Sequence, residues 1–166
     1  MIHHEQRLAW LEKLIKQESA SYATERKAAL IIDTKAGSLV VPFPAIKQVI
    51  PGKRLHSLPF IPQKFCGVVD FEGTLYAIVN VGVHEDEAVE LSKIVLLEGD
   101  VCSFGLLFGG TPNVIYLDEV GDTQRLTTEE RARLSPLVAQ EQFISPNGSL
   151  ILLDVNATAA ALLAPE

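Results

Sequence analysis

The stretch IPQKFCGVVDFEGTLYAIVNV, residues 61–81, decides the fold. It holds two short apolar segments, Cys66–Phe71 and Thr74–Val81, which are separated by Glu72-Gly73. Both segments are rich in β-branched residues, which favour strands, and a two-residue connection that contains glycine is typical of a β-hairpin. The stretch therefore predicts two antiparallel strands joined by a tight turn.

The same pattern extends in both directions from this hairpin. Short apolar runs recur between turn residues, with no alternation of strand and helix, which indicates a mainly β protein. Gly37, Gly73 and Gly99 each lie where a hairpin must reverse, so phosphate binding is not needed to explain them. The further predicted strands are Ala28–Asp33, Ser38–Phe43, Ile46–Ile50, Lys93–Glu98, Val101–Phe108 and Val114–Leu117, followed by a pairing of Phe143-Ile144 with Leu150–Val155 across Pro146-Asn147-Gly148.

Three helices are expected beside the strands. Apolar residues recur at three- and four-residue steps over Arg7–Glu18, which predicts an amphipathic helix that packs onto the domain or docks onto a partner helix. Covering an exposed barrel edge and self-association are two further roles for it. Thr127 and Glu130 have capping-box spacing for a helix through Leu134, which Ser135-Pro136 ends, and Asn156 can cap a short C-terminal helix.

Composition limits the class of protein. The 166 residues are 48% hydrophobic and 21% charged, which suits one domain or two small barrels that share a core. The net charge of −7 argues against nucleic acid as a partner. The longest apolar run, residues 159–164, is far shorter than the roughly 20 residues of a membrane span, and the N-terminus does not resemble a secretory signal. Cys66 and Cys102 are expected to be reduced core thiols in a cytoplasmic protein.

No reaction centre is visible in the sequence. The histidines lack metal-ligand spacing, and the acidic run that follows His84 suits a solvated loop better than a cation site. The sequence contains no GxxxxGK[ST], GxGxxG or GxSxG motif, and neither cysteine has neighbours that would activate it. Catalysis and a bound metal are therefore not expected. A β-rich domain of this kind suits protein binding through a groove or a sheet edge.

Three blocks of the chain resemble the CheW-like domain, the coupling module of bacterial chemosensory systems. They are residues 39–50, residues 61–81, and the strand segments 93–97, 104–108, 114–117 and 150–155. The resemblance implies two intertwined five-stranded SH3-like β-barrels over residues 23–166, preceded by a helix and linker at residues 1–22 and ending in a short helix.

The resemblance also implies a role and partners. A CheW-like domain is a non-enzymatic adaptor without a cofactor, which binds the cytoplasmic tip of a chemoreceptor and the regulatory domain of a CheA-type histidine kinase. The expected location is the cytoplasm, at membrane-associated receptor arrays, without insertion into the membrane. Two alternatives stay open: a spacer of the array that does not activate the kinase, and an adaptor of a type IV pilus chemosensory system.

The resemblance assigns site residues position by position. Phe43, Ile46 and Gln48 fall where the family lines its receptor groove, although core packing is an equal alternative for Phe43 and Ile46. Four residues fall on the family's partner-binding turn, and one matches a glycine of the second barrel. These are Gly67, Asp70, Glu72 and Gly73 on the turn, and Gly105 in the barrel.

The chain also departs from the family. Glu72 stands where the family has arginine, so the local charge is reversed, and Asp70 replaces its asparagine. Asn80 replaces an aspartate, residues 81–87 replace an arginine-rich segment, and Gly109 replaces another aspartate. Because mismatched charges suppress wrong partners, these departures predict partners whose charges complement Glu72 and the acidic loop at residues 84–90.

Overall fold

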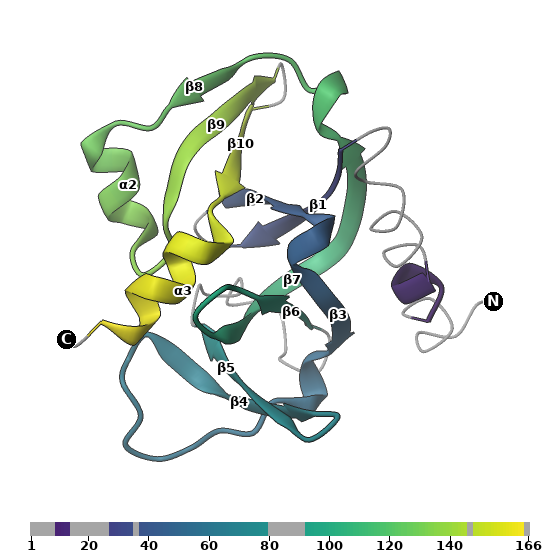
Figure 1. The fold of residues 1–166 in the computed structure, drawn as a ribbon, viewed down its shortest axis with the longest axis vertical. Helices are drawn as coiled ribbons and strands as arrows, with labels where there is room; N and C mark the ends of the chain where they lie inside the picture. The colour runs from purple at the N-terminus through teal and green to yellow at the C-terminus, as the bar shows by residue number, and fades with distance from the viewer. Residues whose placement is uncertain (1–8, 14–26, 35–36, 80–91, 146–147, 165–166) are drawn as a thin grey trace.

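The computed structural model describes residues 9–13, 27–34, 37–79, 92–145 and 148–164. They form a mainly β fold with two labelled α-helices, α2 and α3, on one side of the view in Figure 1. The strands are β1 Ala28–Thr34, β2 Gly37–Pro42, β3 Ile46–Pro51, β4 Phe65–Phe71, β5 Thr74–Val79, β6 Lys93–Glu98, β7 Ser103–Tyr116, β8 Thr123–Arg125, β9 Ala139–Ser145 and β10 Gly148–Leu153. The helices are α2 Thr128–Leu134 and α3 Val155–Leu163, with short 3-10 turns η1 Phe43–Ala45, η2 Gly52–Arg54 and η4 Leu117–Glu119.

The strands form one mixed sheet that is not closed. Its hydrogen-bonded order is β3-β6-β7-β1-β2-β10-β9-β8, and β5 joins β7 while β4 pairs with β5. Most pairs are antiparallel, but β10 pairs with β2, and β5 with β7, in parallel. The predicted mainly β fold is confirmed. In the described residues neither barrel expected from the resemblance is closed by pairing of its end strands, because β3 does not pair with β4 and β8 pairs with β9 alone.

Strand β7 links the two halves of the sheet. The sequence predicts two strands here, Val101–Phe108 and Val114–Leu117, whereas the structure has a single strand of 14 residues. Its first part pairs with β6 and its second part with β1, and the register against β1 shifts between Ile31 and Asp33. The glycines at 109 and 110 therefore mark an irregularity within one strand, not a chain reversal.

The largest buried cluster extends over both halves of the sheet. It combines side chains of β1, β2, β6 and β7 with Val155, Ala159 and Leu162 of α3. Phe43, Phe104 and Phe108 are the largest of its fully buried side chains. A shared cluster makes the two halves one folding unit, because unfolding either half would expose the apolar side chains of the other half to water.

Both described α-helices are capped by a local side chain, but only one of the two caps is the residue that the sequence predicts. The predicted capping box of α2 is confirmed, since Glu130 N donates to Thr127 Oγ1 at 3.2 Å and Thr127 N donates to Glu130 Oε1 at 3.0 Å. The predicted cap of α3 is wrong, because Asp154 Oδ1 accepts from Ala157 N at 3.0 Å. Asn156 Oδ1 instead accepts from Asp100 N at 2.8 Å, which ties α3 to the β6–β7 connection.

The glycines do not all serve the purpose the sequence suggests. Gly37 and Gly73 have φ of +123° and +84°, so their predicted role in reversals is confirmed. Gly99 is not among the residues with positive φ. A Cβ at Gly99 would lie 2.8 Å from the Cβ of Ala159, so this position needs glycine because α3 packs closely against it.

The N-terminal segment packs onto the sheet where it is described. Residues 9–13 are helical, and Leu11 is 8% exposed within the largest buried cluster. Packing onto the domain, the first of the predicted roles, is thus confirmed for these residues. The rest of Arg7–Glu18, the predicted boundary between residues 22 and 23, the turns at residues 35–36 and 146–147, and the acidic loop lie outside the described residues. None of the described helices combines the length and apolar character that crossing a bilayer requires.

Candidate functional site

The three residues that the resemblance places in a receptor groove lie on η1 and on strand β3, which follows it directly. Phe43, in η1, has no exposed surface, and Ile46 is also buried in the largest cluster. The structure therefore places both in the core, as the core-packing alternative expects. Gln48 is 9% exposed, and its Nε2 donates to Glu12 Oε2 at 2.9 Å. The groove role of these residues stays a prediction, and Gln48 is the polar member of the set.

The predicted partner-binding turn is a tight hairpin between β4 and β5. Glu72 and Gly73 both have positive φ, +52° and +84°, which is the geometry of a type I′ turn. Asp70 Oδ1 accepts a hydrogen bond from Gly73 N at 3.1 Å, which stabilises the turn. The Glu72 side chain is exposed at the tip. Asp70 and Gly73 thus shape the turn, and Glu72 is the side chain that a partner can contact.

A cation from another element lies beside this turn. Arg54, in η2, donates from Nη2 to Asp70 O at 3.1 Å, and its guanidinium carbon lies 5.8 Å from the centre of the Phe71 ring. Arginine over an aromatic face is an attractive arrangement. Arg54 therefore holds the end of β4 just before the turn, a contact that the local sequence around residue 72 does not reveal.

Gly67 and Gly105 have steric roles. A Cβ at Gly67 would collide with the carbonyl oxygen of His56, because residues 55–56 lie against β4 through paired hydrogen bonds between His56 and Val68, each 2.9 Å long. A Cβ at Gly105 would lie 2.6 Å from Ile78 Cδ1. Both glycines therefore permit close packing inside the β4–β7 half, and their place at a partner interface stays a prediction.

The connection from η2 to β4 exposes apolar side chains. Phe60 is fully exposed and has φ of +60°, and Leu58 is also exposed. A left-handed backbone is uncommon for a bulky residue. The sequence does not mark these residues, since an apolar side chain in a short loop does not reveal whether it packs inward.

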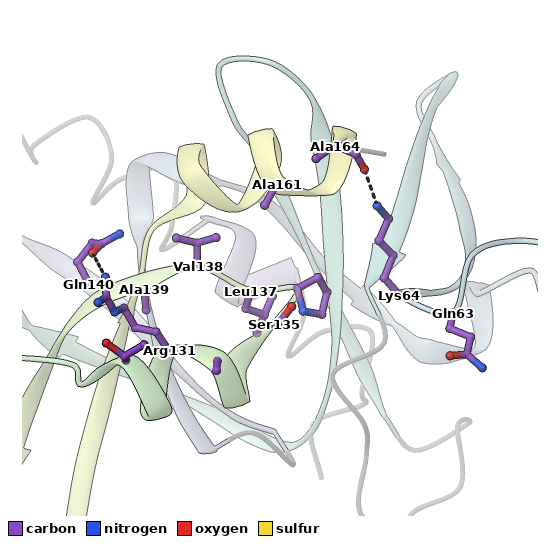
Figure 2. Close-up of a pocket in the computed structure, with 13 residues that line it drawn as sticks. Gln63, Lys64, Arg131, Ser135, Leu137, Val138, Ala139, Gln140, Ala161 and Ala164 are labelled. Carbon is purple, nitrogen blue, oxygen red and sulfur yellow. Dashed lines mark hydrogen bonds between the residues drawn. The ribbon is translucent and has the colours of Figure 1, made fainter. Parts of the chain in front are cut away.

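A basic groove lies between α2, the start of β9, the C-terminal end of α3 and the approach to β4 (Figure 2). Its volume is about 840 Å³, and its lining includes the apolar residues Leu137 and Val138. Lys64 and Arg131 lie on opposite sides of it in Figure 2, and none of the described residues that line it is a carboxylate. Lys64 Nζ donates to the carbonyl of Ala164 at 3.2 Å, and Arg131 Nη1 donates to Gln140 Oε1 at 3.5 Å.

An acidic groove lies at the other end of α3. Its volume is about 590 Å³, and it is bordered by η1, the β6–β7 connection, β9 and the start of α3. Four carboxylates line it, and Gln140 borders both grooves: the acids are Glu98, Asp100, Glu141 and Asp154. The two hollows thus differ in charge, which suits contacts with two surfaces of opposite sign. Neither groove is visible in the sequence, because the lining residues of each come from distant parts of the chain.

The described residues contain no cluster of three or more histidine, cysteine or acidic side chains that could hold a metal ion. The two cysteines are free and half-buried. Burial raises the pKa of the Cys66 thiol, which a backbone hydrogen bond lowers only in part, and burial also raises the pKa of Cys102. A raised pKa keeps both as thiols near neutral pH, as expected of the reduced cysteines that the sequence predicts.

The fold is similar to that of a known scaffolding protein. The structure of the scaffolding protein CheW from Thermoanaerobacter tengcongensis superposes with a TM-score of 0.62 at 12% sequence identity, over 81% of this chain and 88% of that chain. No family model matches the sequence, and no curated protein does so either. At this identity the likeness establishes the fold, a CheW-type arrangement of strands. It does not extend to partners.

Proposed function

We propose that this protein is a non-enzymatic adaptor of a bacterial chemosensory system, which couples the cytoplasmic tips of chemoreceptors to the regulatory domain of a CheA-type histidine kinase. The observation that carries the proposal is the fold shared with a scaffolding protein over 81% of the chain. In this proposal the protein works in the cytoplasm, at receptor arrays, and needs no cofactor.

The surface of the molecule is consistent with a connecting role. The basic and acidic grooves lie at opposite ends of α3, and the β4–β5 turn presents Glu72 beyond the body of the sheet. A protein that joins two others needs at least two separate surfaces, and surfaces of different charge discriminate between partners. These features support an adaptor.

Binding to both proposed partners tests the adaptor role. The labelled full chain is titrated with a receptor cytoplasmic hairpin fragment and, separately, with a kinase regulatory domain from the same organism. We expect saturable binding to each, and a ternary complex when both are present. Absence of binding to either fragment at saturating concentration would contradict the coupling role.

Glu72 is the residue with which to examine partner choice. Glu72→Arg changes the charge by two units at an exposed position that already tolerates a side chain with positive φ, so stability should move by less than about 0.5 kcal/mol. We expect the affinity for one of the two fragments to change. Asp122→Arg, a reversal of the same size at an exposed position that lines neither groove, is the matched control. Equal binding by both variants and the wild type would remove Glu72 from the interface.

Kinase output distinguishes the spacer alternative from the adaptor. Arrays are reconstituted from receptor, kinase and this protein, and phosphorylation is measured with and without it. An adaptor increases the output, whereas a spacer enters the array without increasing it. Glu72 favours the spacer alternative, because it stands where CheW-like domains have arginine.

A further inference from the structure

The basic groove differs in charge from the molecule as a whole. The chain carries 21 acidic and 14 basic residues, for a net charge of −7, so its overall field repels anions. The described residues that line this groove include two cations, Lys64 and Arg131, and none of them is acidic. Four carboxylates line the other groove, at the opposite end of α3. An acidic ligand is therefore attracted to one end of α3 and repelled from the other.

Apolar surface lies between the two cations. Val138, just before β9, and Ala161 of α3 both line the groove and are partly exposed. In Figure 2 these two side chains lie between Arg131 on one side and Lys64 on the other. The volume of about 840 Å³ is far larger than a single small anion fills and falls within the usual range for organic ligands. A groove of this kind suits a peptide that carries apolar side chains between acidic ones.

Within the described part of the chain, both cations donate hydrogen bonds to neutral acceptors. Lys64 Nζ donates to the carbonyl of Ala164 at 3.2 Å, at the end of α3. Arg131 Nη1 donates to Gln140 Oε1 at 3.5 Å, which is long for such a bond. A guanidinium forms shorter and stronger hydrogen bonds with a carboxylate than with an amide, and it can do so through two nitrogens at once. A carboxylate that replaces Gln140 as the acceptor would therefore bind Arg131 more strongly.

We propose that the basic groove binds a short acidic segment of another protein, whose apolar side chains lie on Val138 and Ala161 and whose carboxylates pair with Arg131 and Lys64. The inference goes beyond the adaptor role and does not rest on it, because none of the residues that the resemblance assigns to partners lines this groove. Arg131 is the main determinant of binding, since Lys64 also holds the end of α3.

A synthetic peptide tests the proposed site. The probe is a fluorescein-labelled peptide with two central leucines flanked on both sides by aspartate and glutamate, and its anisotropy is followed as the full chain is added. We expect saturable binding that weakens as the salt concentration rises, because salt screens exposed charges. A peptide with the same flanks and two central serines should bind at least about fivefold more weakly, since it buries less apolar surface.

Arg131→Glu reverses the charge at an exposed position of the groove. Attraction to the acidic peptide becomes repulsion, so binding should weaken about tenfold or more. Arg133→Glu is the matched control, because Arg133 is exposed on the same helix, does not line the groove and gives the same net charge. Its affinity should stay within about twofold of the wild type. Equal weakening by both variants would show a general response to net charge and would overturn the site.

A second pair of variants tests the groove without a change of charge. Ala161→Gln places a longer polar side chain in the groove and should weaken binding about tenfold, since it removes the apolar contact. Ala160→Gln is the control, because Ala160 is an exposed neighbour on α3 that does not line the groove. Far-UV circular dichroism and the midpoint of thermal unfolding check that every variant is folded.

The outcomes distinguish the possible occupants. Weaker binding by the Arg131→Glu and Ala161→Gln variants, with both controls unchanged, supports the proposal. Absence of saturable binding by the wild type at low salt overturns it, and so does displacement of the peptide by an equal concentration of inorganic phosphate, which would indicate a simple anion site. Self-association of the protein alone, detected by analytical ultracentrifugation and abolished by Arg131→Glu, would make a second copy the occupant and would also overturn it. The receptor and kinase titrations test the adaptor role separately.

Discussion

Replacing Phe43 by alanine should destabilise the protein by about 3–5 kcal/mol. Phe43 has no exposed surface and lies in the cluster that also contains Leu97 and Phe104, so truncation removes a whole buried ring and leaves a cavity. Typical domains are stable by about 5–15 kcal/mol, so the loss is a large share of the total. At about 2–4 °C for each kcal/mol, the midpoint of thermal unfolding should fall by roughly 6–20 °C.

Phe60 supplies the matched control. It is the same residue type with its side chain fully exposed, so Phe60→Ala should change stability by no more than about 0.5 kcal/mol. The assay is urea unfolding followed by far-UV circular dichroism, in which both the midpoint and the slope are determined. An unchanged slope shows that the surface exposed on unfolding is the same, so a shift of the midpoint measures stability.

The comparison decides between the two roles proposed for Phe43. If Phe43→Ala lost less than about 1 kcal/mol with an unchanged slope, the core role would be refuted and a role as a partner anchor would regain support. If the loss is as large as expected, weaker partner binding by this variant cannot be attributed to a lost contact.

Three further predictions follow from single contacts. Gly99→Ala places a methyl group 2.8 Å from Ala159 Cβ, so we expect a lower urea midpoint; an unchanged midpoint would show that α3 moves aside at no cost. The capping hydrogen bonds from Thr127 hold the pKa of Glu130 below its usual 4.5, so this carboxylate contributes stability that is present above pH 4.5 and is lost as the pH falls through the lowered pKa. Unfolding midpoints at pH 7 and pH 3 should therefore differ less in the Glu130→Gln variant than in the wild type, and an equal difference would exclude this linkage. Because burial raises its pKa, Cys66 should react with a thiol reagent at neutral pH much more slowly than it does in the urea-unfolded chain, whereas equal rates would mean that the thiol is accessible.

Local sequence determined those parts of the fold that depend on near neighbours. The hairpin at Glu72-Gly73 was predictable because two consecutive residues with positive φ join strands of matching twist. The capping box of α2 was predictable for a similar reason, since Thr127 and Glu130 satisfy each other's backbone amides over three residues. The mainly β class also followed from spacing, because alternating apolar runs between turn residues have few other ways to bury their side chains.

Tertiary structure alone decided how these pieces meet. The basic groove brings Lys64 to Ala164, 100 residues away, and the contact of Gln48 with Glu12 spans 36 residues. Gly99 is needed for the approach of Ala159, and the glycines at 109 and 110 lie within one strand because β7 changes partners there. A turn or a cap is fixed by hydrogen bonds among a few adjacent residues. A groove or a covered strand depends instead on which distant surfaces pack together, and a local sequence pattern does not determine that packing.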